Sequence, residues 1–315
     1  MKRPICLAAI LLLLSATSAT TPTVAHASYP GRNGLIVFEG WVACVAPHCV
    51  SPANPAYDLW TVASDGTGLT NITNAPGVDT SAVWSPDGSK IAFASNRNGD
   101  YDLFVTDPDG SNTTQITRGV GDDGDPTWGP SGRRIAFLNY ARRTTDIVVM
   151  RPDGSRRKRI ASFEYGYGLQ WSPDGRWLAL TKVTEKRSGI VLIRPDGSER
   201  RWLTPKRIGG ESPAWAPDGK RITFTGWEKC TECDHADIFV IRRDGAGLRK
   251  LVDDELWQSH PAWSPDGKEI VYTSEVPGTG FDGDLWIIAA DGSNKRRLIA
   301  KADSWDWNAD WQPLP

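Results

Sequence analysis

Histidine is scarce in this chain, and the common catalytic motifs are missing from it. Only four of the 315 residues are histidine, and three of them, His48, His235 and His260, follow residue 27. There is no Gly-x-Ser-x-Gly elbow, His-Glu-x-x-His pair or Walker loop, and no Gly-x-Gly-x-x-Gly segment follows a strand. A lyase that uses a metal ion with a lysine or arginine base is an alternative, but the pattern favours a protein without catalysis.

Long apolar runs are also missing beyond the first residues. A basic start over residues 1–3 precedes an apolar run over residues 5–14, and small residues flank position 27. This order predicts a signal peptide over residues 1–27 that is cleaved before Ser28, because the apolar run is too short to span a bilayer. We therefore expect a secreted or periplasmic protein without a transmembrane segment after cleavage.

Charge of either sign is close to balanced. The formal net charge is −2, and it becomes −4 without residues 1–27, which hold Lys2 and Arg3 and no acidic residue. A dedicated nucleic-acid binder would carry a basic surplus. The composition therefore argues against nucleic acid as the ligand.

Cysteine is limited to five residues, of which four form two close pairs after residue 27. These four are Cys44, Cys49, Cys230 and Cys233. Close, even pairs in an exported protein predict two local disulfides that fix loops. Zinc binding is the alternative, because His48 and His235 lie beside the two pairs and supply the other common zinc ligand.

Tryptophan, in contrast, is abundant and recurs at a nearly constant interval. The repeat tryptophans are Trp84, Trp128, Trp171, Trp215, Trp263 and Trp311, which lie 44, 43, 44, 48 and 48 residues apart. The first five open versions of one phrase, Trp-Ser-Pro-Asp-Gly. A second Asp-Gly series keeps the same step, at Asp65, Asp109, Asp153, Asp196, Asp244 and Asp291. Self-similarity at this period is typical of a propeller or a solenoid.

Each repeat predicts four short antiparallel strands. In the unit that starts before Trp84, the Trp strand leads through a Pro-Asp-Gly turn to a strand at 90–93, a loop and a strand at 102–105. An Asp-Gly hairpin turn at 109–110 then leads to a short outer strand that ends near Thr117. No segment has convincing helical periodicity. The chain is therefore predicted to be all-β.

The two ends of the chain predict a closed ring. Pro30-Gly31 aligns with the turn after a Trp strand, so the first unit lacks that strand, and residues 306–313 repeat it at the other end of the chain. Donating the last strand to the first sheet would leave no exposed edge. We expect one domain over residues 28–315, a six-bladed β-propeller of four-stranded antiparallel blades, with the C-terminal strand joining the N-terminal blade.

The phrase Trp-Ser-Pro-Asp-Gly-x-x-Ile-Ala-Phe, followed by Asp-Leu-Phe-Val and Asp-Gly, resembles the WD40-like (PD40) repeat of TolB-type propellers. The resemblance implies the propeller fold over nearly all of the predicted mature chain. TolB proteins carry an additional N-terminal domain, for which this chain has no room. Similar propellers serve as the non-catalytic domain of prolyl-oligopeptidase-like peptidases and as oligogalacturonate lyase-like enzymes. The resemblance therefore leaves a carbohydrate-active enzyme, or a partner of a separately encoded peptidase, as alternatives.

The repeat departs from its pattern in three units that closure makes neighbours. The loop between the second and third strands covers eight residues in units two to four, but it grows over residues 225–236, 273–283 and 39–57 in units five, six and one. Five tryptophans outside the regular positions fall in or beside these units: Trp41, Trp227, Trp257, Trp305 and Trp307. Together with His260 they predict a recognition surface for a protein, peptide or glycan. The alternative is that they only pack the long loops.

Acidic residues five positions before the repeat tryptophan suggest a second site. Asp79, Asp123 and Asp306 hold this position, where they could bind a calcium ion or accept hydrogen bonds between blades; the second role is favoured. No other cofactor is indicated. Basic residues cluster at the hairpin turns, at residues 156–159, 200–201, 249–250 and 295–297. They are expected to protect edge strands, with contact to anionic envelope polymers as the alternative.

The sequence as a whole thus predicts an exported binding protein rather than an enzyme. We expect a monomeric, non-catalytic binding propeller whose ligand contacts concentrate on the loops of units five, six and one.

Overall fold

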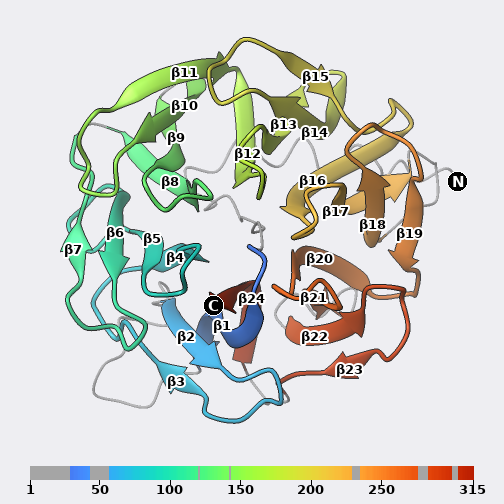
Figure 1. The fold of residues 1–315 in the computed structure, drawn as a ribbon, viewed down its shortest axis with the longest axis horizontal. Helices are drawn as coiled ribbons and strands as arrows, with labels where there is room; N and C mark the ends of the chain where they lie inside the picture. Colours follow the sequence, from blue (N-terminus) through green and yellow to red (C-terminus); the bar gives the residue numbers. More distant parts are fainter. Residues whose placement is uncertain are drawn as a thin grey trace, which may run out of the picture.

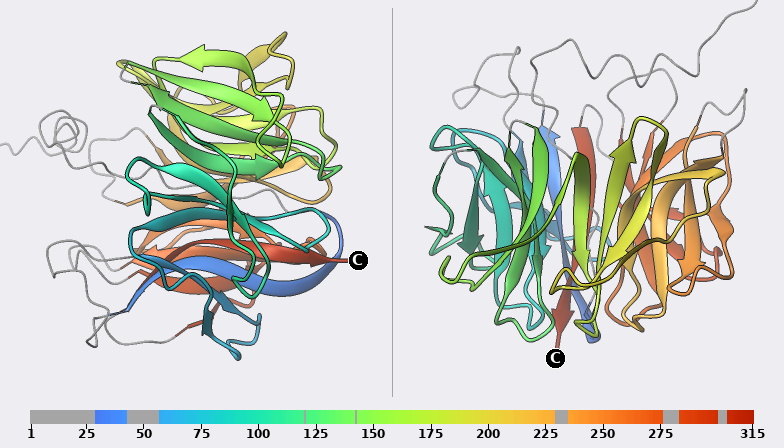
Figure 2. Two further views of the ribbon diagram at one scale, coloured as in Figure 1. Left: turned by 90° about the vertical axis from the view of Figure 1, so that its left-hand side faces the viewer. Right: turned by 90° about the horizontal axis from the view of Figure 1, so that it is seen from above.

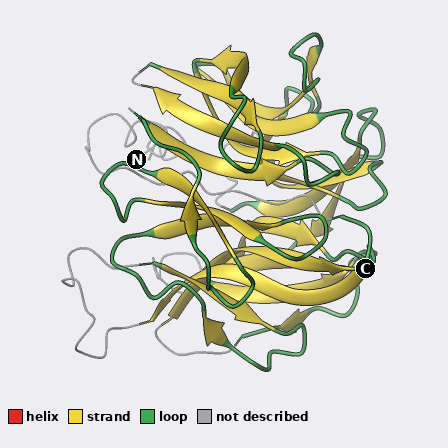
Figure 3. Cartoon of the chain, turned by 60° about the vertical axis from the view of Figure 1, so that its left-hand side comes forward, coloured by secondary structure: helices red, strands yellow, loops and turns green. Residues whose placement is uncertain are grey.

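The structure is a computed structural model that describes residues 29–42, 57–119, 121–141, 143–228, 235–275, 283–299 and 304–315. The side chains of residues 41, 42, 304 and 305 lie outside this description, as do all five cysteines. Every regular element among the described residues is a β-strand (Figure 3). No helix in this part of the chain could serve as a membrane span.

Six four-stranded antiparallel sheets stand around a common axis, as the repeat predicts (Figure 1). Blade 1 combines β24 (Ser304–Leu314), β1 (Arg32–Val42), β2 (Asp58–Val62) and β3 (Thr70–Asn71). Blade 2 contains β4 (Asp79–Trp84), β5 (Ile91–Ser95), β6 (Asp102–Thr106) and β7 (Thr114–Gln115). Blade 3 contains β8 (Asp122–Trp128), β9 (Ile135–Ala141), β10 (Thr144–Met150) and β11 (Lys158–Phe163).

The other half of the ring repeats this order. Blade 4 contains β12 (Tyr165–Trp171), β13 (Leu178–Thr184), β14 (Arg187–Ile193) and β15 (Arg200–Trp202). Blade 5 contains β16 (Ile208–Trp215), β17 (Arg221–Glu228), β18 (Asp237–Arg242) and β19 (Arg249–Val252). Blade 6 contains β20 (Trp257–Trp263), β21 (Glu269–Glu275), β22 (Asp284–Ala289) and β23 (Arg296–Arg297).

The C-terminal strand closes the ring, which confirms the prediction from the chain ends. β24 pairs antiparallel with β1 from Arg32, opposite Leu314, to Val42, opposite Ser304. Both strands have 11 residues and are the longest in the described chain. Blade 1 therefore depends on residues from both ends of the sequence, and the sheet edge that an open array would expose is paired.

The propeller has two unlike faces (Figure 2). On the turn face, the inner strands β4, β8, β12, β16 and β20 end in their Trp and the turns follow, and Pro315 after β24 also lies there. On the loop face, the inner strands β4, β8, β12, β16, β20 and β24 begin and the second strand of each blade leads to the third. This order of strands sets which residues share a face.

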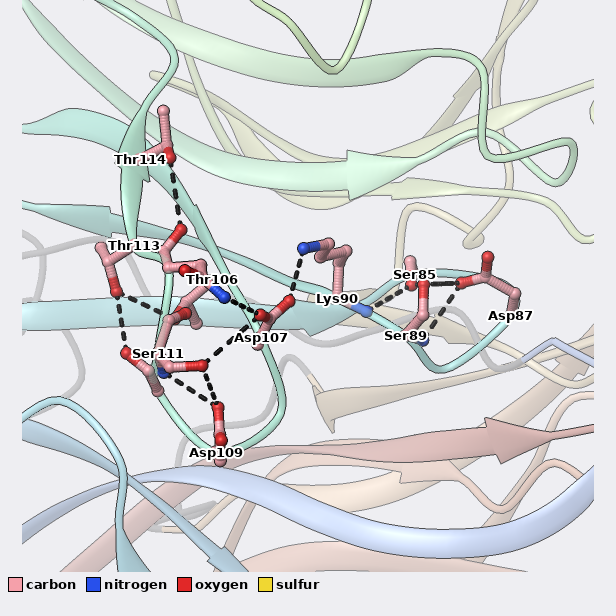
Figure 4. Close-up of polar contacts among 12 residues, drawn as sticks. Ser85, Asp87, Ser89, Lys90, Thr106, Asp107, Asp109, Ser111, Thr113 and Thr114 are labelled. Atoms are coloured by element: carbon pink, nitrogen blue, oxygen red, sulfur yellow. Dashed lines mark hydrogen bonds and ion pairs between the residues drawn. The ribbon is translucent and has the colours of Figure 1, made fainter.

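The turns of the repeat hold themselves together with side-chain hydrogen bonds (Figure 4). The Ser85 hydroxyl lies 2.7 Å from a carboxylate oxygen of Asp87 and accepts the backbone N–H of Lys90 at 3.0 Å. Asp87 also accepts the backbone N–H of Ser89 at 3.1 Å. Gly88 follows with φ of 67°, which glycine adopts without strain. Trp-Ser-Pro-Asp-Gly is therefore a turn motif.

The Asp that opens the third strand of a blade bonds to the outer strand 13 residues later. These pairs are Asp58 with Asn71 at 2.8 Å, Asp102 with Gln115 at 2.7 Å, Asp146 with Arg159 at 3.1 Å, Asp237 with Lys250 at 2.9 Å, and Asp284 with Arg297 at 2.6 Å. Such contacts fix a strand that has only a few residues to pair. This Asp series belongs to the architecture.

The repeat tryptophans are buried between blades. Trp84, for example, is 1% exposed and shares a core cluster with Val37 and Leu59 of blade 1 and with Phe93 of its own blade. Its backbone N–H donates to Asp310 of blade 1 at 2.8 Å. A fully buried aromatic side chain stabilises the fold by roughly 1.5–3 kcal/mol through burial alone. The six tryptophans thus hold neighbouring blades together.

Residues 29–31 cross between blades at the turn face. The hydroxyl of Tyr29, which is buried, donates to the backbone carbonyl of Trp128 in blade 3. The backbone N–H of Gly31 donates to the carbonyl of Pro265, in the turn between β20 and β21 of blade 6, at 3.3 Å. This short segment therefore links opposite sides of the ring before β1 begins.

Candidate functional site

The most exposed large apolar side chains lie at the loop face, at the start of two inner strands. Trp257 opens β20 and is 41% exposed, and Tyr165 opens β12 and is 40% exposed. They are the two exposed large hydrophobic residues of the described chain. The ring of Tyr167 lies 5.8 Å from that of Tyr165. Aromatic side chains of this kind suit contact with a partner.

Trp227 and Trp41 lie in strands, which corrects their expected placement in loops. β17 extends to Glu228 and β1 to Val42, so both tryptophans belong to the ends of second strands. Trp227 is half-buried and covers Gly209 so closely that an added Cβ there would meet the indole at 2.1 Å. Its indole therefore packs on backbone of its own blade. The side chains of Trp41 and Trp305 lie outside the description.

Trp307 joins the rim from blade 1. It is half-buried inside β24, and its ring centroid lies 5.7 Å from that of Tyr57 at an interplanar angle of 32°. The ring of His260 in blade 6 lies 6.4 Å away, edge-on at 65°. We define the aromatic rim as Trp227, Trp257, Trp307, Tyr57 and Tyr165, which the strand order places at the loop-face ends of blades 1, 4, 5 and 6.

An axial ring of six residues lies below the rim. Each inner strand has a β-bulge whose middle residue takes positive φ, three positions before the repeat Trp. We define the bulge ring as Ser81, Asp125, Gly168, Ser212, His260 and Asn308, with φ of 58°, 52°, 67°, 49°, 51° and 54°. Left-handed φ is strained for residues other than glycine and marks places worth a functional test.

Glu39 lies behind this ring, buried in β1 at 1% exposure. It accepts the backbone N–H of Ser81 from blade 2 at 2.6 Å, and the side-chain amide of Asn308 also donates to it. Burial raises the pKa of Glu39 to about 7, although these hydrogen bonds act in the opposite direction. The carboxyl group is therefore partly protonated at neutral pH.

Asp125 is the second buried acid of the ring, with no exposed surface. One of its oxygens accepts the N–H of Gly168 in blade 4 at 2.6 Å and the hydroxyl of Tyr140 at 2.8 Å. Burial, and to a smaller extent the negative charge of Glu39, raises its pKa to about 7, although its hydrogen bonds act in the opposite direction. The charge of Glu39 in blade 1 thus affects Asp125 in blade 3, with blade 2 between them.

Several buried polar atoms around the ring have no hydrogen-bond partner in the described chain. They include Asp125 Oδ1, Ser212 Oγ, His260 Nε2 and Asn308 Oδ1. His260 is uncharged at neutral pH, because burial lowers its pKa to about 4. Unpaired buried polar atoms are rare in folded proteins.

Two of the acids named as calcium candidates have protein donors. Arg97 contacts both carboxylate oxygens of Asp79, at 2.8 and 2.9 Å, and Asn139 donates to Asp123 at 2.7 Å. Asp306 is buried at 5% exposure. The described residues contain no group of three His, Cys, Asp or Glu side chains that could hold a metal ion. These contacts match the structural role better than the calcium alternative.

The predicted disulfides Cys44–Cys49 and Cys230–Cys233 lie outside the described residues, as does His48. They stay predictions, together with the zinc alternative. His235 is described, and its Nε2 lies 3.8 Å from a carboxylate oxygen of Asp237. That contact lies at the start of β18 and does not involve the bulge ring.

Basic side chains near the turns connect blades. Arg157 of blade 3 donates to the carbonyl of Ile116 in blade 2 at 3.2 Å, and Arg296 of blade 6 donates to Ser64 of blade 1 at 3.0 Å. A pocket of about 280 Å³ opens between blades 2 and 3. It is lined by Arg118, Gly119, Asp123, Phe137, Asn139, Val148, Arg157 and Arg159. Part of the basic surface therefore connects blades, a structural role other than the expected protection of edge strands.

Sequence reasoning missed Glu39, Asp125 and the tyrosines of the loop face. A comparison of aligned positions could have found the first. Where Glu39 stands, the other repeats have Ala94, Leu138, Thr181, Thr225 and Thr273. These residues all lie in the second strand of their blade, which pairs with the inner strand. Glu39 is the one acid among them, and it bonds to Ser81 of the neighbouring blade. Alignment could also have found Tyr165, because it stands six residues before its repeat Trp, where two other units have Trp257 and Trp305.

Comparisons with known proteins agree with this architecture. A family model described as the TolB beta propeller domain (PD40) matches residues 98–229 and 170–314. TolB from Acinetobacter baumannii is 22% identical with a TM-score of 0.76, over 89% of this chain and 67% of that one. A putative TolB from Agrobacterium tumefaciens is 17% identical with a TM-score of 0.67, over 90% and 99%.

A more distant similarity widens the range of functions that this fold can serve. A chain of a nidogen/laminin complex is 12% identical with a TM-score of 0.69, over 89% of this chain and 98% of that one. No curated protein matches the chain. Likeness at these identities concerns the fold alone.

Proposed function

Because the chain belongs to the TolB β-propeller family, we propose that it is an exported, non-catalytic binding propeller that recognises a protein, peptide or glycan at its loop face. The observation that carries this proposal is the aromatic rim. Trp257 and Tyr165 are exposed there, although every repeat tryptophan of the same inner strands is buried. Exposed aromatic side chains around an axis offer a rigid surface for a partner.

The proposed surface consists of aromatic side chains and of the long loops beside them. Trp257, Trp307 and Tyr57 offer flat rings, on which a sugar ring or an apolar side chain could pack. The loops of blades 5, 6 and 1 were expected to complete the surface, and their central residues lie outside the description. Ligand contact is proposed for Trp41, Trp227 and Trp305 on the same grounds. A chain of a nidogen/laminin complex has a similar fold, which supports a binding role.

The test is a binding screen on residues 28–315 against glycans and cell-envelope proteins. The double variant Trp257→Ala/Tyr165→Ala should lose at least 10-fold in affinity for the ligand found, while its melting temperature stays within about 2 °C, because both side chains are exposed. Lys268→Ala, exposed on the turn face, is the matched control. Equal affinity of the double variant would contradict the proposal.

A second candidate function rests on the two buried acids. Glu39 and Asp125 have pKa values of about 7, in the range that suits a general acid and a general base. A carbohydrate-active enzyme could use such a pair. Turnover of a glycan that the propeller binds, lost in both Glu39→Gln and Asp125→Asn, would favour this candidate. Binding without turnover favours the non-catalytic proposal.

A further inference from the structure

The pocket between blades 2 and 3 contains an arginine at a position where other blades have an apolar side chain. In blades 1 and 5, the residue three positions after the hairpin glycine is Leu69 or Leu248. Both leucines pack against the core cluster that their blade shares with the preceding one. Blade 3 has Arg157 at this position, and its side chain lines the pocket of about 280 Å³. A charged group therefore lies at a junction that is apolar elsewhere in the ring.

Blade 6 shows how a cation at the equivalent position is balanced. Its residue is Lys295, whose Nζ lies 2.5 Å from a carboxylate oxygen of Asp254, in the connection from blade 5. The side-chain amide of Gln258 also donates to Asp254, at 2.6 Å. Gln258 and Asp123 both stand five residues before a repeat Trp. Four residues earlier, the connection has Asp254 in one case and Gly119 in the other. The junction of blades 2 and 3 thus lacks the acid that balances its cation.

The guanidinium of Arg157 is fixed in place without an anionic partner. It donates to the backbone carbonyls of Ile116 at 3.2 Å, Gly154 at 3.3 Å and Arg118 at 3.5 Å. No carboxylate in the described part of the chain forms an ion pair with it. A guanidinium has five N–H donors, so two of them are left for another group.

Two more arginines line the same pocket. Arg118 is exposed, and its guanidinium forms no hydrogen bond or ion pair with the residues that the structure describes. Arg159 is exposed as well and pairs with Asp146 at 3.1 Å. Phe137 and Val148 supply the apolar part of the lining. The pocket therefore combines free guanidinium donors with an apolar wall.

We propose that this pocket binds the oxyanion of a small organic molecule, a carboxylate or a phosphate group, at the position equivalent to the Asp254 carboxylate. The planar donors of an arginine match two oxygens of either group. The volume of about 280 Å³ is near the lower end of pockets that hold small molecules. None of the lining residues belongs to the aromatic rim, so the site is independent of the ligand proposed for the loop face.

Asp123 is the acid that lines the pocket, and its charge opposes an anion. It is 4% exposed and accepts the amide of Asn139 at 2.7 Å, whereas the arginines are exposed. Burial raises the pKa of Asp123, and Asp102 of blade 2 adds to this, while its hydrogen bonds and the charge of Arg157 lower it. In blade 6 the equivalent residue is Gln258, which carries no charge. Replacing Asp123 with an amide should therefore strengthen the site.

The test compares probes that differ in charge. Glycerol 3-phosphate is matched by glycerol, and succinate is matched by succinamide. Titration calorimetry on residues 28–315 at pH 7.5 and low salt should give at least 10-fold tighter binding for a charged probe than for its neutral match, because hydrogen bonds between charged groups are the strong ones. The charged probe that binds identifies the oxyanion as phosphate or carboxylate.

Three variants assign the binding to the pocket. Arg157→Leu, which introduces the residue type of blades 1 and 5, should weaken binding of the charged probe at least 10-fold. Asp123→Asn should tighten it at least 3-fold. Arg156→Asn is the matched control, because it removes the same charge from the same turn outside the pocket. Asn112 and Asn294 hold that position in other blades with the same positive φ, so the control should fold and change the affinity less than 2-fold.

Thermal melting verifies that the variants are folded. If Arg157→Leu does not fold, Arg118→Gln provides the same test, because that side chain is exposed and should contribute at least 3-fold to the affinity. Equal binding of charged and neutral probes overturns the oxyanion site. Binding that neither arginine variant weakens overturns it as well, because the anion then binds elsewhere. Both results leave recognition at the loop face intact, which the variant of Trp257 and Tyr165 tests separately.

Discussion

The two faces of the propeller use carboxylates in opposite ways. At the turn face, Asp87 accepts hydrogen bonds from its own turn and Asp174 binds Arg243 of the next blade at 2.7 Å. Near the loop face, Glu39 and Asp125 are buried without a basic partner among the described residues. These carboxylates of the turn face thus have partners within the protein, whereas the two acids near the axis lack a cationic one. Paired carboxylates in turns indicate architecture, and buried acids without a cation mark a place to test for function.

The largest effect should come from removing the closure that both faces share. Deleting residues 304–315 removes β24 and exposes the edge of β1. It also removes the Asp310 carboxylate that accepts the backbone N–H of Trp84. The expected loss in the free energy of unfolding exceeds the roughly 5–15 kcal/mol that stabilises a typical domain. Circular dichroism should show no cooperative unfolding transition. Deleting only Pro315 is the control, and a cooperative transition in the longer deletion would contradict the closure argument.

A core tryptophan and a rim tryptophan should separate stability from binding. Trp171→Ala empties a fully buried site and should lower the free energy of unfolding by about 3–5 kcal/mol. Trp257→Ala, at an exposed position, should change it by less than about 0.5 kcal/mol. Urea denaturation measures both values. Similar losses in the two variants would show that the rim is part of the core.

The buried acids should make the protein less stable as pH rises. The pKa of Glu39 is about 7 in the folded state against 4.5 in its absence, so the folded state binds more protons. The stability linked to this proton is complete below pH 4.5 and is lost as pH rises through 7, by about 3 kcal/mol at most. Asp125, Tyr57 and Tyr101 also interact with this carboxyl group.

Urea denaturation at pH 5 and pH 8 measures this linkage as a difference between two proteins. Wild type should lose more stability between the two pH values than Glu39→Gln, in which the titrating group is missing. Asp65→Asn, at an exposed turn, serves as the control with a wild-type profile. A parallel profile for Glu39→Gln would mean that the carboxyl group titrates as it does in water.

The smallest effect is expected at a single turn. Asp174→Ala removes hydrogen bonds with Ser172 at 2.6 Å and with the N–H of Arg176 at 3.0 Å, and the ion pair with Arg243. Because the turn is partly exposed, water replaces much of what is lost, and we expect a destabilisation of about 1 kcal/mol. Ligand binding should stay unchanged. A change in affinity would contradict the division of roles between the faces.

Most of the fold could be predicted because the sequence contains six copies of the blade repeat. The spacing of Trp84 and its equivalents fixed the blades, and the tail around Trp311 fixed the closure. The site could be predicted only in part, because strand lengths and bulges decide which side chains meet. The sequence located Trp257, Trp307 and His260 in one sector, but it could not show that bulges gather polar residues around the axis. Nor could it show that Trp227 covers Gly209.

The last residue, Pro315, and the aromatic rim lie on opposite faces of the propeller. Pro315 lies at the turn face, on the side away from Trp257 (Figure 2). A tether fused there, whether a surface anchor or a reporter domain, would therefore display the opposite side outward and leave access to the axis unobstructed. This makes the carboxyl end the natural place to attach the propeller to a chip or a bead.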